Sequence, residues 1–213
     1  MRCRALVRSS PNPQIRLALW TRKQETQMTG LTELLVPILL SAVLVFVASS
    51  IIHMMSPWHK NDSPRLARED EFRAAVGPLD LPPGDYMIPR AFSTKEMQSE
   101  EFLAKMEQGP NVVMTVMPKG RMTMTRSLVL WFIYILAISI ASAYVAGRAL
   151  APGADYLAVF RFVTTTAFLG YSAALLQMSI WYRRAWNITI KSMIDGFIYA
   201  TLTAGMMGWL WPA

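Results

Sequence analysis

Long apolar segments without a single charged residue recur along the chain. No Asp, Glu, Lys or Arg lies in residues 34–59, 127–147, 162–182 or 196–213. A helix must place about 20 mostly apolar residues in the hydrocarbon core to cross a membrane. Because each segment is about that long, the pattern predicts four transmembrane helices, at 34–55, 127–147, 156–182 and 192–211.

A polar region separates the first predicted helix from the other three. Residues 56–126 carry ten basic and ten acidic side chains and are broken by several Pro and Gly residues. The spacing of apolar residues predicts helices within 65–76 and 95–107, and short strands at 85–88 and 112–117. A region of this size buries only a marginal core. We therefore expect it to lean on the membrane face or on a partner.

These features predict an α-helical integral membrane protein with four transmembrane helices and a small α+β cytosolic insert between helices 1 and 2. The expected parts are a basic N-terminal segment at 1–27, transmembrane helix 1 at 28–55, the insert at 56–126, and helices 2–4 at 127–213.

The formal net charge of +7 is concentrated near the N-terminus. Residues 1–27 hold six basic residues and only Glu25 as an acidic one, whereas the remaining chain holds 15 basic and 13 acidic residues. Such a composition is typical of an organellar transit peptide. The predicted helices need nothing before Met28, so we favour translation starting there, with 1–27 untranslated or disordered. The local charge excess does not indicate nucleic acid as a partner.

Basic residues near the ends of the predicted helices indicate the orientation. One side of the membrane would collect nine of them, namely Lys60, Arg65, Arg68, Lys119, Arg121, Arg126, Arg183, Arg184 and Lys191. The other side would collect Arg148 and Arg161, joined by Arg16, Arg22 and Lys23 if the leading segment is present. Basic residues favour the cytoplasmic side. We therefore expect the insert 56–126 in the cytoplasm and both termini outside.

The segment Ile51–Lys60 contains both histidines of the chain, His53 and His59. Imidazole binds copper, zinc and haem iron, so the pair is a weak candidate for a metal or haem site. Ser56 and Pro57 break helical spacing between the histidines, and the nearby sequence offers no third strong ligand. The simpler interpretation is two polar residues where a helix leaves the bilayer. No cofactor is indicated.

Three further polar residues fall within the predicted membrane helices, namely Arg161, Gln177 and Asp195. Intramembrane charges often mark functional sites, so we group these residues with His53 and His59 as a candidate polar cluster. The predicted topology places Arg161 and Asp195 on opposite sides of the membrane, and Asp195 at the depth of His53. Snorkelling or salt bridging at the helix ends is the simpler alternative.

The last predicted helix carries small residues at every fourth position: Gly196, Ala200, Ala204 and Gly208. Such a face lets two helix backbones approach closely. The second helix offers a matching face in Ser139, Ala143 and Gly147. The chain has one cysteine and lacks phosphate-binding-loop, zinc-protease and serine-hydrolase motifs. We therefore assign no catalytic residue and favour a protein that is not an enzyme.

Four segments carry a resemblance to known sequences: Ile51–Lys60, Pro82–Arg90, Gln177–Arg183 and Gly208–Pro212. In them the chain is similar to a group of uncharacterised bacterial multi-pass membrane proteins, over residues 28–213. The resemblance implies the bacterial inner (plasma) membrane and no particular activity.

The sequence as a whole favours a structural or interaction component of a membrane assembly. Its expected partners are the lipid bilayer and other membrane proteins or further copies of itself. Two alternatives stay open. One is a small oligomeric transporter or channel that uses Arg161 and Asp195, and the other is a metal- or haem-binding membrane protein that uses His53 and His59.

Overall fold

The computed structural model describes residues 12–14 and 28–213. The chain divides into two compact units. The helical unit takes in the chain up to Lys60 together with Thr125–Ala213, and the insert unit is Asn61–Met124. Most of the predicted N-terminal segment lies outside the described residues.

Among the described residues, three helices are long and apolar enough to cross a membrane: Leu35–Met55, Met124–Ala149 and Tyr156–Tyr182. They correspond to the first three predicted spans and indicate a multi-pass membrane protein. The fourth predicted span corresponds to α9 (Trp186–Trp209), a helix of 24 residues. It carries Lys191 and Asp195 and is not among the three.

The first and third spans change helical type along their length, whereas the second does not. α2 (Leu35–Ser50) continues into η1 (Ile51–Met55), a π-helical turn, and η2 (Pro57–His59), a 3-10 turn, follows. α6 (Met124–Ala149) is uninterrupted. The third span comprises α7 (Tyr156–Ser172), the 3-10 turn η4 (Ala173–Leu175) and α8 (Leu176–Tyr182).

α2 shows how the helical unit packs. Its buried positions are mostly small or medium residues: Pro37, Ile38, Ser41, Ala42, Val45 and Ser49. Its outward positions include larger apolar side chains that stay exposed: Leu35, Val36, Leu39, Leu40, Val43 and Val47. Small residues inside and apolar ones outside are the arrangement expected of a helix surrounded by lipid, where close packing rather than the hydrophobic effect joins helices.

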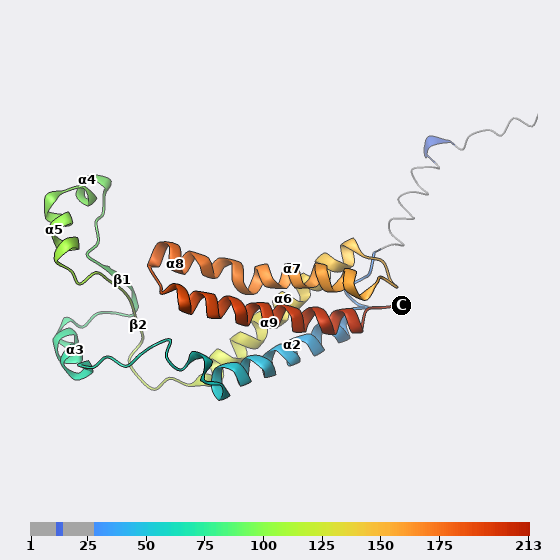
Figure 1. The fold of residues 1–213 in the computed structure, drawn as a ribbon, viewed down its shortest axis with the longest axis horizontal. Coiled ribbons are helices and arrows are strands. Elements are labelled where there is room, and N and C mark those ends of the chain that lie inside the picture. The colour runs from blue at the N-terminus through green and yellow to red at the C-terminus, as the bar shows by residue number, and fades with distance from the viewer. Residues whose placement is uncertain (1–11, 15–27) are drawn as a thin grey trace, which may run out of the picture. The chain divides into compact units, whose positions relative to one another are not determined.

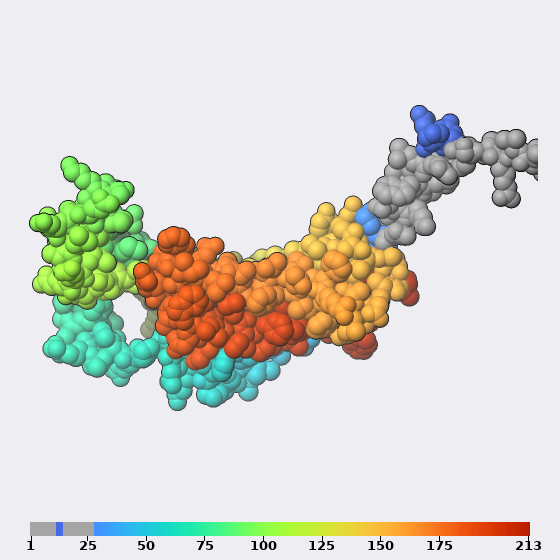
Figure 2. Space-filling view, turned by 45° about the horizontal axis from the view of Figure 1, so that its top comes forward, coloured from blue at the N-terminus to red at the C-terminus, as the bar shows by residue number. Residues whose placement is uncertain are grey.

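α9 lies beside α7 and also contacts α2 (Figure 1). The surfaces of α7 and α9 lie directly against each other (Figure 2). A Cβ atom at Gly196 would collide with α7, and one at Gly208 would lie 2.8 Å from the ring of Tyr156. Ala200 and Ala204, between these glycines, are fully buried. The small-residue face of α9 is therefore used within the chain, with its two glycines packed against α7.

The start of α9 differs from the prediction. The helix begins at Trp186 rather than near Ser192, because the preceding turn is made by Arg183 in the left-handed backbone conformation (φ 57°). A turn this short leaves the residues after Ala185 free to enter the helix. As a result Asp195 lies well inside α9, not at its start, and is only 3% exposed.

The insert unit contains two helical regions and a small sheet, as the sequence predicts. α3 (Glu69–Val76) and the 3-10 turn η3 (Gly77–Leu79) lead to β1 (Gly84–Ile88). α4 (Thr94–Met97) and α5 (Glu100–Gln108) precede β2 (Val112–Val116), which pairs antiparallel with β1. Ser93 and Ser99 cap the two helices by accepting backbone N–H bonds. No residue of 61–124 is buried.

Candidate metal centre

The chain leaves α2 through the segment Ile51–Lys60, here called the exit segment. The Ser56 N–H donates to the Ile51 carbonyl oxygen at 3.0 Å, which is the five-residue bond of a π-helix. Ser56 Oγ then accepts from the Trp58 N–H at 3.1 Å and starts η2, with Pro57 at its first position. This change of helical type at the end of α2 places the two histidines near each other.

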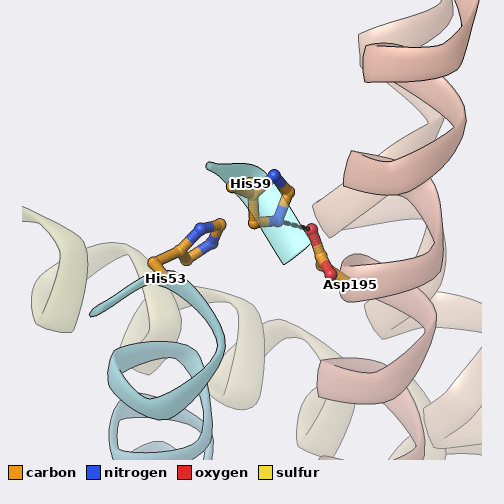
Figure 3. A group of neighbouring side chains, drawn as sticks. All are labelled: His53, His59 and Asp195. Atoms are coloured by element: carbon orange, nitrogen blue, oxygen red, sulfur yellow. Dashed lines mark hydrogen bonds and ion pairs between the residues drawn. The ribbon is translucent and has the colours of Figure 1, made fainter. Parts of the chain in front are cut away.

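The two imidazole rings lie against each other at the end of the first span. Their centroids are 4.4 Å apart and their planes are tilted by 31°. Figure 3 shows His53 on the last turn of the first span and His59 on η2, with the Asp195 side chain of α9 reaching toward His59. The three-dimensional structure thus places a third candidate ligand, Asp195, beside the two histidines.

Asp195 and Tyr199 hold the histidines from one face of α9. His59 Nε2 lies 2.8 Å from Asp195 Oδ2, and Tyr199 Oη lies 3.2 Å from His53 Nε2. Positions 195 and 199 are four apart and share a helix face. The Asp195 side chain is 4% exposed and that of His59 is 16% exposed. Since a buried carboxylate needs a polar partner, this contact is a main determinant of how the exit segment sits on α9.

Lys191 extends the same face by one further turn. Its Nζ donates to the Trp58 carbonyl oxygen at 2.8 Å and lies 5.4 Å from the centre of the Trp58 ring. The Lys191 ammonium above the indole ring and its hydrogen bond to the carbonyl both stabilise the position of the Trp58 backbone. Lys191, Asp195 and Tyr199 therefore form a continuous stripe of polar side chains that holds the exit segment.

Three side chains that could hold a metal ion meet at the centre of this stripe. One donor atom from each of His53, His59 and Asp195 lies within 4.8 Å of the other two. Metal–nitrogen and metal–oxygen bonds to zinc are about 2.0–2.2 Å. To bind one ion, the two imidazole rings would have to turn from their stacked arrangement, because each nitrogen lone pair lies in the plane of its ring and the planes are tilted by only 31°.

The structure brings together three of the five residues of the candidate polar cluster. His53, His59 and Asp195 meet, whereas Arg161 on α7 and Gln177 on α8 have exposed side chains and are not part of the group. The role of Tyr199 was missed by sequence reasoning. The signal that could have found it is the Lys191, Asp195, Tyr199 spacing of four, which predicts one polar face on an otherwise apolar helix.

Comparisons with known protein families, with characterised proteins and with solved structures find no match to this chain.

Proposed function

We propose that the protein is a multi-pass membrane protein that binds a divalent transition-metal ion through His53, His59 and Asp195. The observation that carries this proposal is the convergence of two imidazoles and one buried carboxylate from segments far apart in the sequence. Two nitrogens and one oxygen are a donor set that zinc and neighbouring first-row ions accept. Three protein ligands leave a fourth position for water or another molecule.

Haem fits this arrangement less well than a single ion. A haem iron bound by two histidines takes them on opposite faces of the macrocycle. Here the two rings lie against each other with centroids 4.4 Å apart, so no macrocycle fits between them. The donor set, which includes a carboxylate, also suits a bare ion better than a haem iron.

The membrane arrangement that accompanies this proposal has four spans, with α9 as the fourth. The packing of α9 against α7 supports it, because α9 has the length of a span and two of its polar side chains are engaged by the exit segment. The distribution of basic residues supports a cytoplasmic insert and outer termini. The bacterial inner membrane is proposed from the resemblance of residues 28–213 to bacterial multi-pass membrane proteins. The metal centre would then lie near the cytoplasmic side.

The experiment is a Co²⁺ titration of the full chain in detergent micelles, with any affinity tag removed. Co²⁺ in a tetrahedral nitrogen and oxygen site gives visible absorption bands, and Zn²⁺ displaces it. We expect one ion per chain in the unaltered protein and none in the His53→Gln, His59→Gln double variant. Asp80→Asn is the matched control, since the Asp80 side chain is 81% exposed. The proposal fails if the double variant binds as the unaltered protein does.

The other two hypotheses from the sequence stay proposals of lower rank. A transporter that uses Arg161, Gln177 and Asp195 requires these residues along one path, and the exposed positions of Arg161 and Gln177 lend it no support. A structural or interaction component would use a surface other than the small-residue face of α9, because that face is packed within the chain.

A further inference from the structure

One face of the insert sheet forms an open apolar pocket of about 450 Å³. The floor consists of two cross-strand pairs, Tyr86 with Met114 and Ile88 with Val112. Side chains alternate between the faces of a strand, so these four residues point to the same side. The volume falls within the range of about 300–1,000 Å³ that is usual for small-molecule sites.

Two helices and the chain around them line the rest of this pocket. α3 contributes Phe72 and Val76, and the end of α5 contributes Lys105 and Gln108. Lys105 is the one charged residue of the lining. A ligand with a long apolar body and one anionic group would match this combination of surfaces.

The pocket occupies the place where the insert unit would otherwise have its core. No residue of 61–124 is buried, and Phe72 and Ile88 remain 50% and 47% exposed. A two-stranded sheet is marginally stable unless its apolar face is covered. An apolar ligand would remove these side chains from water and stabilise the unit by the hydrophobic effect.

We propose that this pocket binds the hydrocarbon chain of a long-chain fatty acid, with the carboxylate at Lys105. The insert unit is attached at both ends to helices that are apolar enough to cross a membrane, one ending at Met55 and the other starting at Met124. This attachment makes the insert unit part of a membrane protein, and the membrane is where fatty acids concentrate.

Lys105 is placed to receive the carboxylate. Its side chain is 58% exposed, and its Nζ lies 2.7 Å from Glu101 Oε1. An ammonium group has three donors, so it can hold a ligand carboxylate while it keeps the bond to Glu101. Because the lysine is solvated, this contact selects the anionic ligand, whereas the apolar surface supplies most of the affinity.

The test is photo-crosslinking of the full chain in micelles with palmitic acid that carries a diazirine near the end of its chain. We expect labelled peptides from β1, β2 or α3, and competition by unlabelled palmitic acid. Val112→Trp places a large side chain on the pocket floor and should abolish labelling. Val113→Trp is the matched control, because Val113 lies on the opposite face of the same strand.

A second variant keeps the proposal testable if Val112→Trp impairs folding. Lys105→Gln should weaken palmitic acid binding by about two- to fivefold and leave binding of hexadecanol, which has no charge, unchanged. Equal labelling of Val112→Trp and Val113→Trp would overturn the proposal. So would labelling by a diazirine phosphatidylglycerol but not by the fatty acid, or an equal effect of Lys105→Gln on acid and alcohol.

Discussion

His59 and Asp195 lie 136 positions apart in the chain, and their Nε2 and Oδ2 atoms are 2.8 Å apart. One residue belongs to the exit segment and the other to α9, so the contact closes a loop around more than half of the described chain. The carboxylate is buried, and its partner is therefore important to the fold whether or not an ion binds.

Removal of the His59 ring tests this structural role. In His59→Ala the buried Asp195 carboxylate loses its partner, and we expect the unfolding free energy to fall by about 1–3 kcal/mol. Adding Asp195→Asn should recover part of this loss, because an amide costs less to bury than a charge. The unfolding free energy of each variant is measured by denaturing the purified protein in micelles.

Lys119→Gln is the control for the His59→Ala variant. It breaks the ion pair of Lys119 with Asp80, whose side chains are 88% and 81% exposed. An exposed pair contributes about 1 kcal/mol or less. A His59→Ala loss no greater than that of the control would contradict the structural role.

Gly196 on α9 should tolerate no side chain. A Cβ atom at this position would meet Ser172 Oγ and lie 3.1 Å from Tyr171 Cβ. We expect Gly196→Ala to destabilise the helical unit by about 1–3 kcal/mol through overpacking. Gly205→Ala is the matched control, because a Cβ atom there would lie 3.7 Å from the Tyr156 hydroxyl, at ordinary contact distance. Alanine also has a higher helix propensity than glycine. Equal melting temperatures of the two variants would refute the close packing of α9 on α7.

Tyr199 should act as a positioning residue for the proposed ion. Tyr199→Phe removes the hydroxyl that lies 3.2 Å from His53 Nε2 and keeps the aromatic ring. Loss of such a supporting group typically lowers metal affinity by about 10–100-fold. We expect weaker Co²⁺ binding with an unchanged stoichiometry of one ion. Tyr144→Phe, at a tyrosine that is 54% exposed, should bind as the unaltered protein does.

The interaction of Glu101 with Lys105 on α5 should be measurable as a lowered pKa of Glu101 in a pH titration. The hydrogen bond and the charge of Lys105 lower the pKa of the Glu101 carboxyl. A carboxyl with a lowered folded pKa stabilises the fold above its unfolded pKa, and this contribution is lost as the pH falls through the folded value. Lys105→Gln should raise the pKa of Glu101 in a carbon-13 NMR titration of glutamate-labelled protein. Lys119→Gln, the control, should leave the pKa of Glu101 unchanged.

The sequence predicts the helices well because a membrane span depends on a local property. A run of apolar residues of sufficient length is visible without any knowledge of neighbours, and all three apolar spans of the structure lie where the charge-free segments predict them. The strands of the insert are predicted for a similar reason, since Pro and Gly mark the limits of 85–88 and 112–117.

The candidate metal centre is harder to predict because it depends on long-range contacts. His53 and His59 are only six positions apart in the sequence, whereas the carboxylate comes from α9. α9 starts at Trp186, directly after the left-handed turn at Arg183, and this early start places Asp195 in the interior of the helix. A pattern of apolar residues contains no information about such a turn.

The π-helical turn at Ile51–Met55 also decides how His53 is presented to α9. A π-helical turn closes its hydrogen bond over five residues instead of four, so it accommodates one residue more than an α-helical turn. Deleting one residue would restore an α-helical turn, and the residues that follow would keep nearly the same angle about the helix axis. Such a deletion should therefore disturb the contact of His53 with Tyr199 more than that of His59 with Asp195.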